Sequence, residues 1–193
     1  MPYSHLNDYP ADVRERAARV RLACFDVDGT LTDGRLYFDG NGNELKAFHV
    51  HDGQGLTLLR KVGIEVAFVT ARGGAVAARR AADLGISEMH AGVRDKLECV
   101  RGIAGRLGLD MEQVAFMGDD LADLRVMLQT GFAVAPAGAH RWIAERVHWR
   151  THERAGHGAA REFCDLVLAA QGHAEALLAD LVRVEGTRVE GNA

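Results

Sequence analysis

Short apolar runs alternate with longer segments of mixed polarity over most of the chain. Each run is four to six residues long, which is typical of a buried strand. The segments between them read as helices and several of them stop at glycines, such as Gly63, Gly85 and Gly108. Strands alternating with helices predict right-handed crossovers and a doubly wound α/β fold with a mainly parallel sheet. We predict strands at 22–25, 65–70, 87–91, 114–117 and 132–135, and helices at 12–20, 55–62, 74–84, 96–107 and 121–129.

One stretch departs from this alternation. Two short strand-like runs, 36–38 and 45–49, flank a turn-rich segment that contains Asn41-Gly42. An Asn-Gly pair between two such runs is a strong signal for a tight antiparallel turn. We therefore predict a β-hairpin after the first strand.

Two acidic residues, Asp26 and Asp28, directly follow the first strand. Residues i and i+2 of an extended segment point to the same side, so both carboxylates are expected to face one small volume. Like charges there require a cation or a shared proton. Carboxylate oxygens suit Mg2+, and a carboxylate can also attack phosphorus to form an aspartyl-phosphate. A solvated, Asp-rich turn is the alternative interpretation.

Further polar residues fall at the ends of later predicted strands, Thr70 after one and Asp119 after another. In parallel sheets the ligand lies beyond the carboxyl ends of the strands. The sequence therefore predicts that Asp26, Thr70 and Asp119 meet at one edge of the sheet.

Composition narrows the class of protein. Of 193 residues, 27 are acidic and 23 basic, and no basic stripe points to a nucleic-acid partner. The polar N-terminus and the lack of a long apolar segment predict neither a signal peptide nor a membrane span. Three widely spaced cysteines favour a reducing, cytoplasmic compartment. We predict one domain over residues 1–182 and a disordered tail at 183–193.

Four motifs in order carry a family resemblance. Asp26-x-Asp28, Thr70, Lys96 and Gly118-Asp119-Asp120 together resemble the haloacid dehalogenase superfamily of phosphotransferases, over roughly residues 22–171. The resemblance implies a Rossmann-like haloacid dehalogenase fold, a Mg2+ cofactor and hydrolysis of a phosphate ester. A signalling receiver domain also gathers acidic residues, a Thr and a Lys around Mg2+, but it carries them in another order.

The resemblance also assigns roles to single residues. Asp26 is the nucleophile and Asp28 the general acid and base, and Asp26, Asp28 (by its backbone carbonyl) and Asp119 bind the metal. Thr70 is expected to hold a phosphoryl oxygen through its hydroxyl and its backbone N–H, and Lys96 to neutralise the charge shared by nucleophile and phosphate.

Taken singly, each of these residues has a structural interpretation. Thr70 is an ordinary strand residue, Lys96 a surface lysine, and Asp119-Asp120 a helix cap. Asp123 is interpreted as a surface residue or as one lying behind the metal ligands. A catalytically idle scaffold domain is the corresponding alternative for the whole chain.

The segments after the first and second motifs are short. Residues 33–63 leave room for the hairpin and one helix, and residues 72–96 for one helix and a short strand. We therefore predict a protein without a cap domain, whose site is open unless another subunit covers it. The exposed hairpin offers an edge for pairing, so we expect a homo-oligomer, with a tetramer favoured by the resemblance. A monomer is the alternative.

Finer features resemble one branch, the 3-deoxy-manno-octulosonate 8-phosphate phosphatase family, which would place the chain in lipopolysaccharide precursor synthesis. In that family the Gly-rich run at 156–162 approaches the active site, often of a neighbouring subunit. Arg161 is then a candidate for binding the substrate's carboxylate, and Arg72 for binding its carboxylate or its phosphate. An ion pair on the helix surface is the alternative for Arg161. The motifs that carry the resemblance are Asp33-Gly34, Phe48-x-x-x-Asp52-Gly53-x-Gly55, Thr70-Ala71-Arg72, Asp95-Lys96, Gly118-Asp119-Asp120-Leu121-x-Asp123-Leu124 and Gly156-His157-Gly158-Ala159-Ala160-Arg161-Glu162.

Three positions depart from the family pattern, namely Arg125, Ala155 and His157. They leave the four chemical motifs intact but put tail flexibility and substrate choice in question. An N-acylneuraminate 9-phosphate or other nonulosonate phosphatase remains an alternative, because both substrates pair a distal phosphate with a carboxylate-bearing ring.

Overall fold

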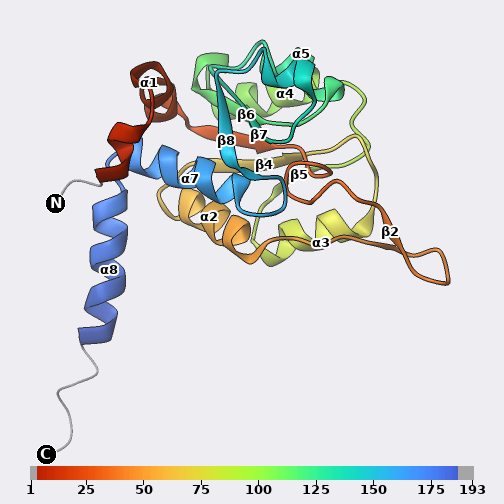
Figure 1. Cartoon of the computed structure of the whole chain (residues 1–193), viewed down its shortest axis with the longest axis horizontal. Helices are drawn as coiled ribbons and strands as arrows, with labels where there is room; N and C mark the ends of the chain where they lie inside the picture. The colour runs from red at the N-terminus through yellow and green to blue at the C-terminus, as the bar shows by residue number, and fades with distance from the viewer. Residues whose placement is uncertain (1–3, 187–193) are drawn as a thin grey trace, which may run out of the picture.

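The computed structural model describes residues 4–186, and its centre is a six-stranded sheet in the order β5-β4-β1-β6-β7-β8 (Figure 1). Every neighbouring pair of strands is parallel. The predicted α/β class with a mainly parallel sheet is confirmed. The strands are β1 (Leu22–Phe25), β4 (Glu65–Val69), β5 (Glu88–His90), β6 (Val114–Met117), β7 (Phe132–Ala137) and β8 (Trp149–Arg154).

Helices cover both faces of the sheet, as a doubly wound fold requires (Figure 1). In β1, Ala23 and Phe25 pack into a core shared with α1, α2, α3 and α7, whereas Leu22 and Cys24 pack against α4 and α5. This division follows from the alternation of side chains along a strand. The helices are α1 (Ala11–Arg19), α2 (Val50–Lys61), α3 (Ala75–Asp83), α4 (Lys96–Leu107), α5 (Leu121–Met127), α6 (Arg141–Ala144), α7 (Ala159–Ala170) and α8 (Ala174–Gly186), with 3-10 turns η1 (Ser4–Asp8) and η2 (Met111–Gln113).

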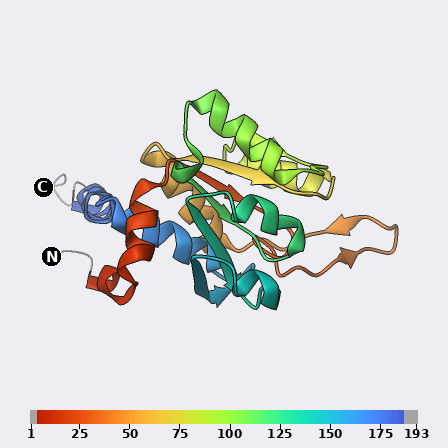
Figure 2. The same cartoon turned by 90° about the horizontal axis from the view of Figure 1, so that it is seen from above.

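The predicted hairpin is present as a separate two-stranded sheet of β2 (Tyr37–Phe38) and β3 (Glu44–Leu45). It projects from the body, at the end opposite α8 (Figures 1 and 2). Residues 33–63 hold only this hairpin and α2, and residues 72–96 only α3, β5 and the start of α4. The prediction of a fold without a cap domain is therefore confirmed.

Some boundaries differ from the prediction. α2 begins at Val50 instead of residue 55, although two glycines weaken its first turns, because Asp52 in that turn is fixed by contacts with α7. β8 was not predicted, because Trp149 is its only apolar residue. α8 extends to Gly186, four residues into the range predicted as a tail, and residues 187–193 lie outside the described part. The single-domain limits of 1–182 stay a prediction.

Among the described residues, no helix has the length and apolar character needed to cross a lipid bilayer.

Candidate active site

Asp26 is the first residue after β1, and its carboxyl group is buried at the carboxyl end of the sheet. Its backbone N–H donates to the Met117 carbonyl of β6, which continues the strand pairing by one residue. The chain then turns sharply, as the N–H groups of Thr30, Leu31 and Thr32 all converge on the Val27 carbonyl. The apolar strand thus delivers a carboxylate to a fixed point at the edge of the sheet.

Lys96, the first residue of α4, contacts the Asp26 carboxylate. Its Nζ lies 2.5 Å from Asp26 Oδ1 and 2.6 Å from Asp123 Oδ1, and its side chain is only 4% exposed. Burial opposes the charge of this ammonium, but the two carboxylates outweigh that effect and hold the pKa of Lys96 above its ordinary value. The interpretation of Lys96 as a surface lysine is wrong.

Three carboxylates gather beside Lys96. One oxygen each from Asp26, Asp119 and Asp123 lie within 4.8 Å of one another, and these three residues are called the acidic group below. Burial, with the charge of Asp123 next in effect, raises the pKa of Asp26 to about 6, and burial with the charge of Asp26 raises the pKa of Asp119 to about 7. When all three carboxylates are ionised, one ammonium leaves two negative charges uncompensated, which is what a divalent cation with oxygen ligands would neutralise.

Asp119 is held from two sides. The Thr30 hydroxyl donates to its Oδ1 at 3.3 Å, and a Cβ at Gly29 would lie 2.2 Å from its Oδ2. Gly29 also has a φ of +90°, a conformation that glycine adopts without strain. The loop after β1 can therefore lie this close to the end of β6 only because residue 29 has no side chain.

Asp123 is the functional residue whose place the sequence left open. It is 1% exposed, so the interpretation as a surface residue is wrong. While its Oδ1 contacts Lys96, its Oδ2 accepts the backbone N–H groups of Asp119 and Asp120 at 3.1 and 3.2 Å. Asp120 in turn caps α5, in agreement with the helix-cap interpretation of Asp119-Asp120. The capping-box spacing Asp120-x-x-Asp123 is therefore the signal that could have identified Asp123.

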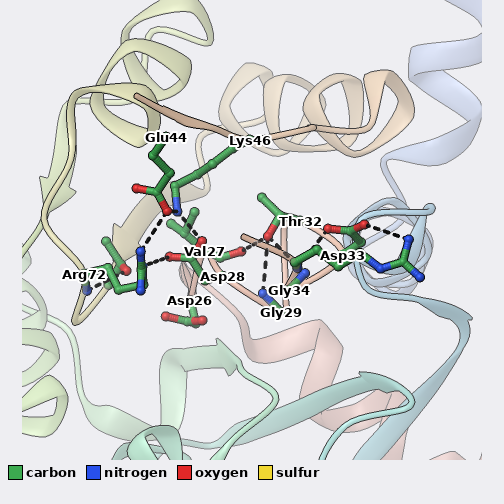
Figure 3. Close-up of polar contacts among 12 residues, drawn as sticks. Asp26, Val27, Asp28, Gly29, Thr32, Asp33, Gly34, Glu44, Lys46 and Arg72 are labelled. Atoms are coloured by element: carbon green, nitrogen blue, oxygen red, sulfur yellow. Dashed lines mark hydrogen bonds and ion pairs between the residues drawn. The ribbon is translucent and has the colours of Figure 1, made fainter. Parts of the chain in front are cut away.

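Asp28 turns its carboxylate away from this acidic group. Its Oδ1 accepts a hydrogen bond from Lys46 Nζ, and its Oδ2 lies 3.7 Å from Arg72 Nε (Figure 3). Asp26 and Asp28 thus have different partners among the described residues, and the expectation that both carboxylates face one small volume stays a prediction. The backbone carbonyl of Asp28 remains the proposed contact with a metal.

Thr70 and Arg72 follow β4, beside Asp28. Thr70 is buried, but its backbone N–H donates to the His90 carbonyl of β5, so the expectation that this N–H holds a phosphoryl oxygen is wrong. Its hydroxyl accepts the Arg72 N–H at 3.2 Å. The structure therefore brings Thr70, Arg72 and Asp28 together, with the Thr70 hydroxyl as the group left for phosphate.

Arg161 lies elsewhere, on α7. Its Nε donates to Asp165 Oδ1 at 2.8 Å, in a half-buried i,i+4 pair, and its backbone N–H donates to Asp52. Neither of these partners belongs to the acidic group, and the arrangement matches the helix ion pair considered as its alternative. Its role in substrate binding stays a prediction.

The Gly-rich run packs against the loop after β1 of its own chain. A Cβ at Gly156, whose φ is +67°, would lie 2.6 Å from the Asp33 nitrogen and the Thr32 carbonyl carbon. A cavity of about 370 Å3 opens beside this contact and reaches Asp119. It is lined by Gly29, Asp33, Gly34, Arg35, Asp119, Ala137, Gly138, Ala139, Arg154, Ala155 and His157.

The positions that depart from the family pattern make local contacts. Arg125 pairs with Asp95 at 2.5 Å and links α5 to the start of α4, and His157 Nδ1 lies 2.9 Å from the Ala155 carbonyl. None of these contacts disturbs the acidic group or Lys96.

Comparison with known proteins shows the family to which the chain belongs. No protein-family model matches the chain. The 3-deoxy-D-manno-octulosonate 8-phosphate phosphatase of Yersinia pestis is 44% identical over 164 residues, which cover 85% of this chain and 88% of that protein. The chain belongs to the 3-deoxy-D-manno-octulosonate 8-phosphate phosphatase family. Through this family it belongs to the haloacid dehalogenase superfamily, so the resemblance seen in the sequence is confirmed.

Solved structures agree with the family assignment. A hypothetical protein from Xanthomonas campestris is 58% identical, with a TM-score of 0.90 over 93% of this chain and 98% of that one. The family member from Moraxella catarrhalis, solved with magnesium ion, phosphate ion and a molecule of the sugar acid (KDO), is 36% identical, with a TM-score of 0.87 over 90% of this chain and 99% of that one.

Proposed function

We propose that this protein is a Mg2+-dependent phosphatase that hydrolyses 3-deoxy-D-manno-octulosonate 8-phosphate to the free sugar acid and phosphate. The observation that carries the proposal is the buried Asp26 beside Lys96 and Asp119, at the carboxyl end of the sheet. Members of the family at 43–44% identity support the substrate, and so does the Moraxella structure with its sugar acid.

The acidic group fits Mg2+, because its oxygens carry more negative charge than Lys96 neutralises. Asp26, Asp119 and the backbone carbonyl of Asp28 would hold the ion. When bound, it would supply positive charge that stabilises the phosphoryl oxygens. Asp123 is instead committed to Lys96 and to two backbone N–H groups.

In the proposed reaction, Asp26 and Asp28 have the roles that the family resemblance implies. An oxygen of Asp26 attacks phosphorus while the bond from phosphorus to the sugar oxygen breaks, and Asp28 gives its proton to that oxygen. A water molecule then gives a proton to Asp28 and attacks the same phosphorus, which releases phosphate and frees Asp26. Lys96 and the Thr70 hydroxyl hold the phosphoryl oxygens in both steps.

The sugar acid needs contacts beyond the phosphate. The position of Arg72 beside Asp28, with its side chain 45% exposed, supports its proposed role in binding a substrate carboxylate or phosphate. Because Arg161 lies away from this point within one chain, its proposed role requires a neighbouring subunit. The exposed apolar side chains of the hairpin, Phe38 and Leu45, support a homo-oligomer, for which we propose a tetramer. The cytoplasmic location and the role in lipopolysaccharide precursor synthesis belong to the same proposal.

The test is Mg2+-dependent phosphate release from 3-deoxy-D-manno-octulosonate 8-phosphate, N-acylneuraminate 9-phosphate and simple hexose phosphates. We expect the octulosonate to be preferred, and both chelator and Asp26→Asn to abolish its hydrolysis. Preference for the nonulosonate would keep the mechanism and change the substrate. No release from any ester by the folded protein with Mg2+ would contradict the proposal and favour a non-catalytic domain.

A further inference from the structure

The end of the hairpin reverses the usual placement of apolar and charged residues. Leu45 is 55% exposed, whereas the side chain of Lys46 is only 3% exposed. Glu44 lies in β3 and Lys46 directly follows this strand; both side chains reach the body, where they meet each other and Asp28, whereas Leu45 between them is exposed. A buried lysine beside an exposed leucine requires a specific partner, because burying an unpaired ammonium is costly.

That partner is the carboxylate proposed as the acid and base of the reaction. Lys46 Nζ donates to Asp28 Oδ1 and lies 3.4 Å from Glu44 Oε1. Arg72 completes a ring of alternating charge, since its Nη2 lies 2.8 Å from Glu44 Oε1 and its Nε 3.7 Å from Asp28 Oδ2 (Figure 3). The ring joins three segments of chain: the loop after β1, the end of β3 and the loop after β4.

The two oxygens of Asp28 are not equivalent in this ring. Oδ1 is committed to Lys46, whereas Oδ2 is buried and makes no hydrogen bond with any part of residues 4–186. An oxygen held by an ammonium is poorly placed to donate or accept a proton. Lys46 therefore leaves Oδ2 as the oxygen for proton exchange and fixes the rotation of the carboxyl group that carries it.

We infer that Lys46, supported by Glu44, is a positioning residue that aims Oδ2 of Asp28 at the leaving oxygen of the substrate. The inference rests on the proposed function, because it takes Asp28 to be the proton donor. Arg72 is 45% exposed and is free to exchange Asp28 for substrate, but Lys46 is enclosed and stays with Asp28. The hairpin thus influences proton transfer through Lys46, which orients the Asp28 carboxyl group.

The test compares Lys46→Met with wild type on a series of substituted phenyl phosphates that differ in the pKa of the leaving phenol. Good leaving groups need no proton and poor ones do, so the slope of log kcat/KM against leaving-group pKa reports proton donation. We expect the slope for Lys46→Met to be steeper than that of wild type and close to that of Asp28→Asn. The double variant Lys46→Met, Asp28→Asn should have the same slope as Asp28→Asn alone. On the sugar phosphate we expect kcat to fall about 10- to 100-fold, with KM changed less than kcat.

The control is Lys61→Met, because Lys61 at the end of α2 makes an exposed 2.7 Å pair with Asp180 of α8. We expect it to leave slope and kcat unchanged. Lower activity of Lys46→Met with an unchanged slope would overturn the inference, because Lys46 would then act on substrate or on folding. A wild-type enzyme that hydrolyses no phosphate ester would instead contradict the proposed function itself.

Discussion

Gly29 lies directly against the carboxylate of Asp119. A methyl group at residue 29 would lie 2.2 Å from Asp119 Oδ2, and the φ of +90° would add backbone strain. We expect Gly29→Ala to displace this carboxylate and to raise the Mg2+ concentration for half-maximal activity by about tenfold or more, measured by titrating Mg2+ in the phosphate-release assay.

Gly172 provides the control for backbone strain alone. Its φ is +76°, and a Cβ there would meet nothing within 4 Å. Gly172→Ala should lower stability slightly and leave the Mg2+ requirement unchanged. If Gly29→Ala kept the wild-type requirement, Asp119 would not be a metal ligand.

The acidic group also makes stability depend on pH. The pKa values of Asp26 and Asp119, about 6 and about 7, lie above the ordinary value of 3.8, so the native state without metal binds more protons than the unfolded state between these limits. Its stability therefore falls as pH rises through this window. Because Mg2+ competes with these protons, we expect the rise in Tm on adding Mg2+ to grow from about pH 5 to about pH 8, measured by calorimetry. A Mg2+ effect on Tm that is constant over this range would contradict the assignment of both ligands.

At the residue scale, the sequence predicted those groups that a strand end delivers directly. Asp26 and Asp119 follow β1 and β6 at once, so their meeting point was predictable from a parallel sheet. The sequence left Asp123 open between a surface position and one behind the metal ligands, and it assigned no role to Lys46, because an acid on a helix and a lysine on a hairpin have ordinary surface roles. Only the three-dimensional structure shows that each binds a charge buried on another segment.

At the element scale, Asp52 joins α2 to α7. It is 2% exposed and accepts the backbone N–H groups of Gly158 and Arg161, at the start of α7, at 3.4 and 2.8 Å. It therefore satisfies two of the N–H groups that a helix leaves unpaired at its start. The family motif Phe48-x-x-x-Asp52-Gly53-x-Gly55 thus builds the packing of two helices, as a Cβ at Gly55 would lie 3.0 Å from the Arg161 and Cys164 side chains.

We expect Asp52→Ala to lower the free energy of unfolding by about 1–2 kcal/mol, since it removes the cap of α7. Urea unfolding measures this loss. Asp83→Ala removes an exposed i,i+4 partner of Arg79 and is the control, with an expected change of at most about 0.5 kcal/mol. Equal stability of Asp52→Ala and wild type would show that solvent satisfies these N–H groups instead.

Element boundaries were less predictable than element types. The alternation of strands and helices was sufficient for the sheet, but the first turn of α2 depends on α7, which lies about 100 residues further along the chain. Contacts of this range leave no local pattern. β8 also depends on a partner outside its own sequence, because its pairing with β7 defines it as a strand.

At the scale of the whole molecule, the hairpin is the proposed contact between subunits. Phe38 is 61% exposed and Leu45 55%, on a two-stranded sheet that has no third strand among residues 4–186. We expect the double variant Phe38→Ser, Leu45→Ser to shift the protein from tetramer to smaller species in light scattering, with an unchanged circular dichroism spectrum.

Leu178→Ser is the matched control, because Leu178 is also 55% exposed but lies on α8, at the opposite end of the molecule (Figure 1). It should leave the oligomer intact. A wild-type protein that is monomeric at all concentrations would contradict the proposed assembly.

In the proposed assembly, a newly synthesised protomer would carry the apolar hairpin in water until other protomers cover it. Encounter between protomers depends on their concentration, so a cell that makes little of this chain leaves a larger share of it uncovered. Uncovered strand edges with apolar side chains are sites of aggregation and proteolytic attack. The abundance of the protein would therefore respond more than proportionally to its rate of synthesis, because each additional protomer shortens the time for which the others remain exposed.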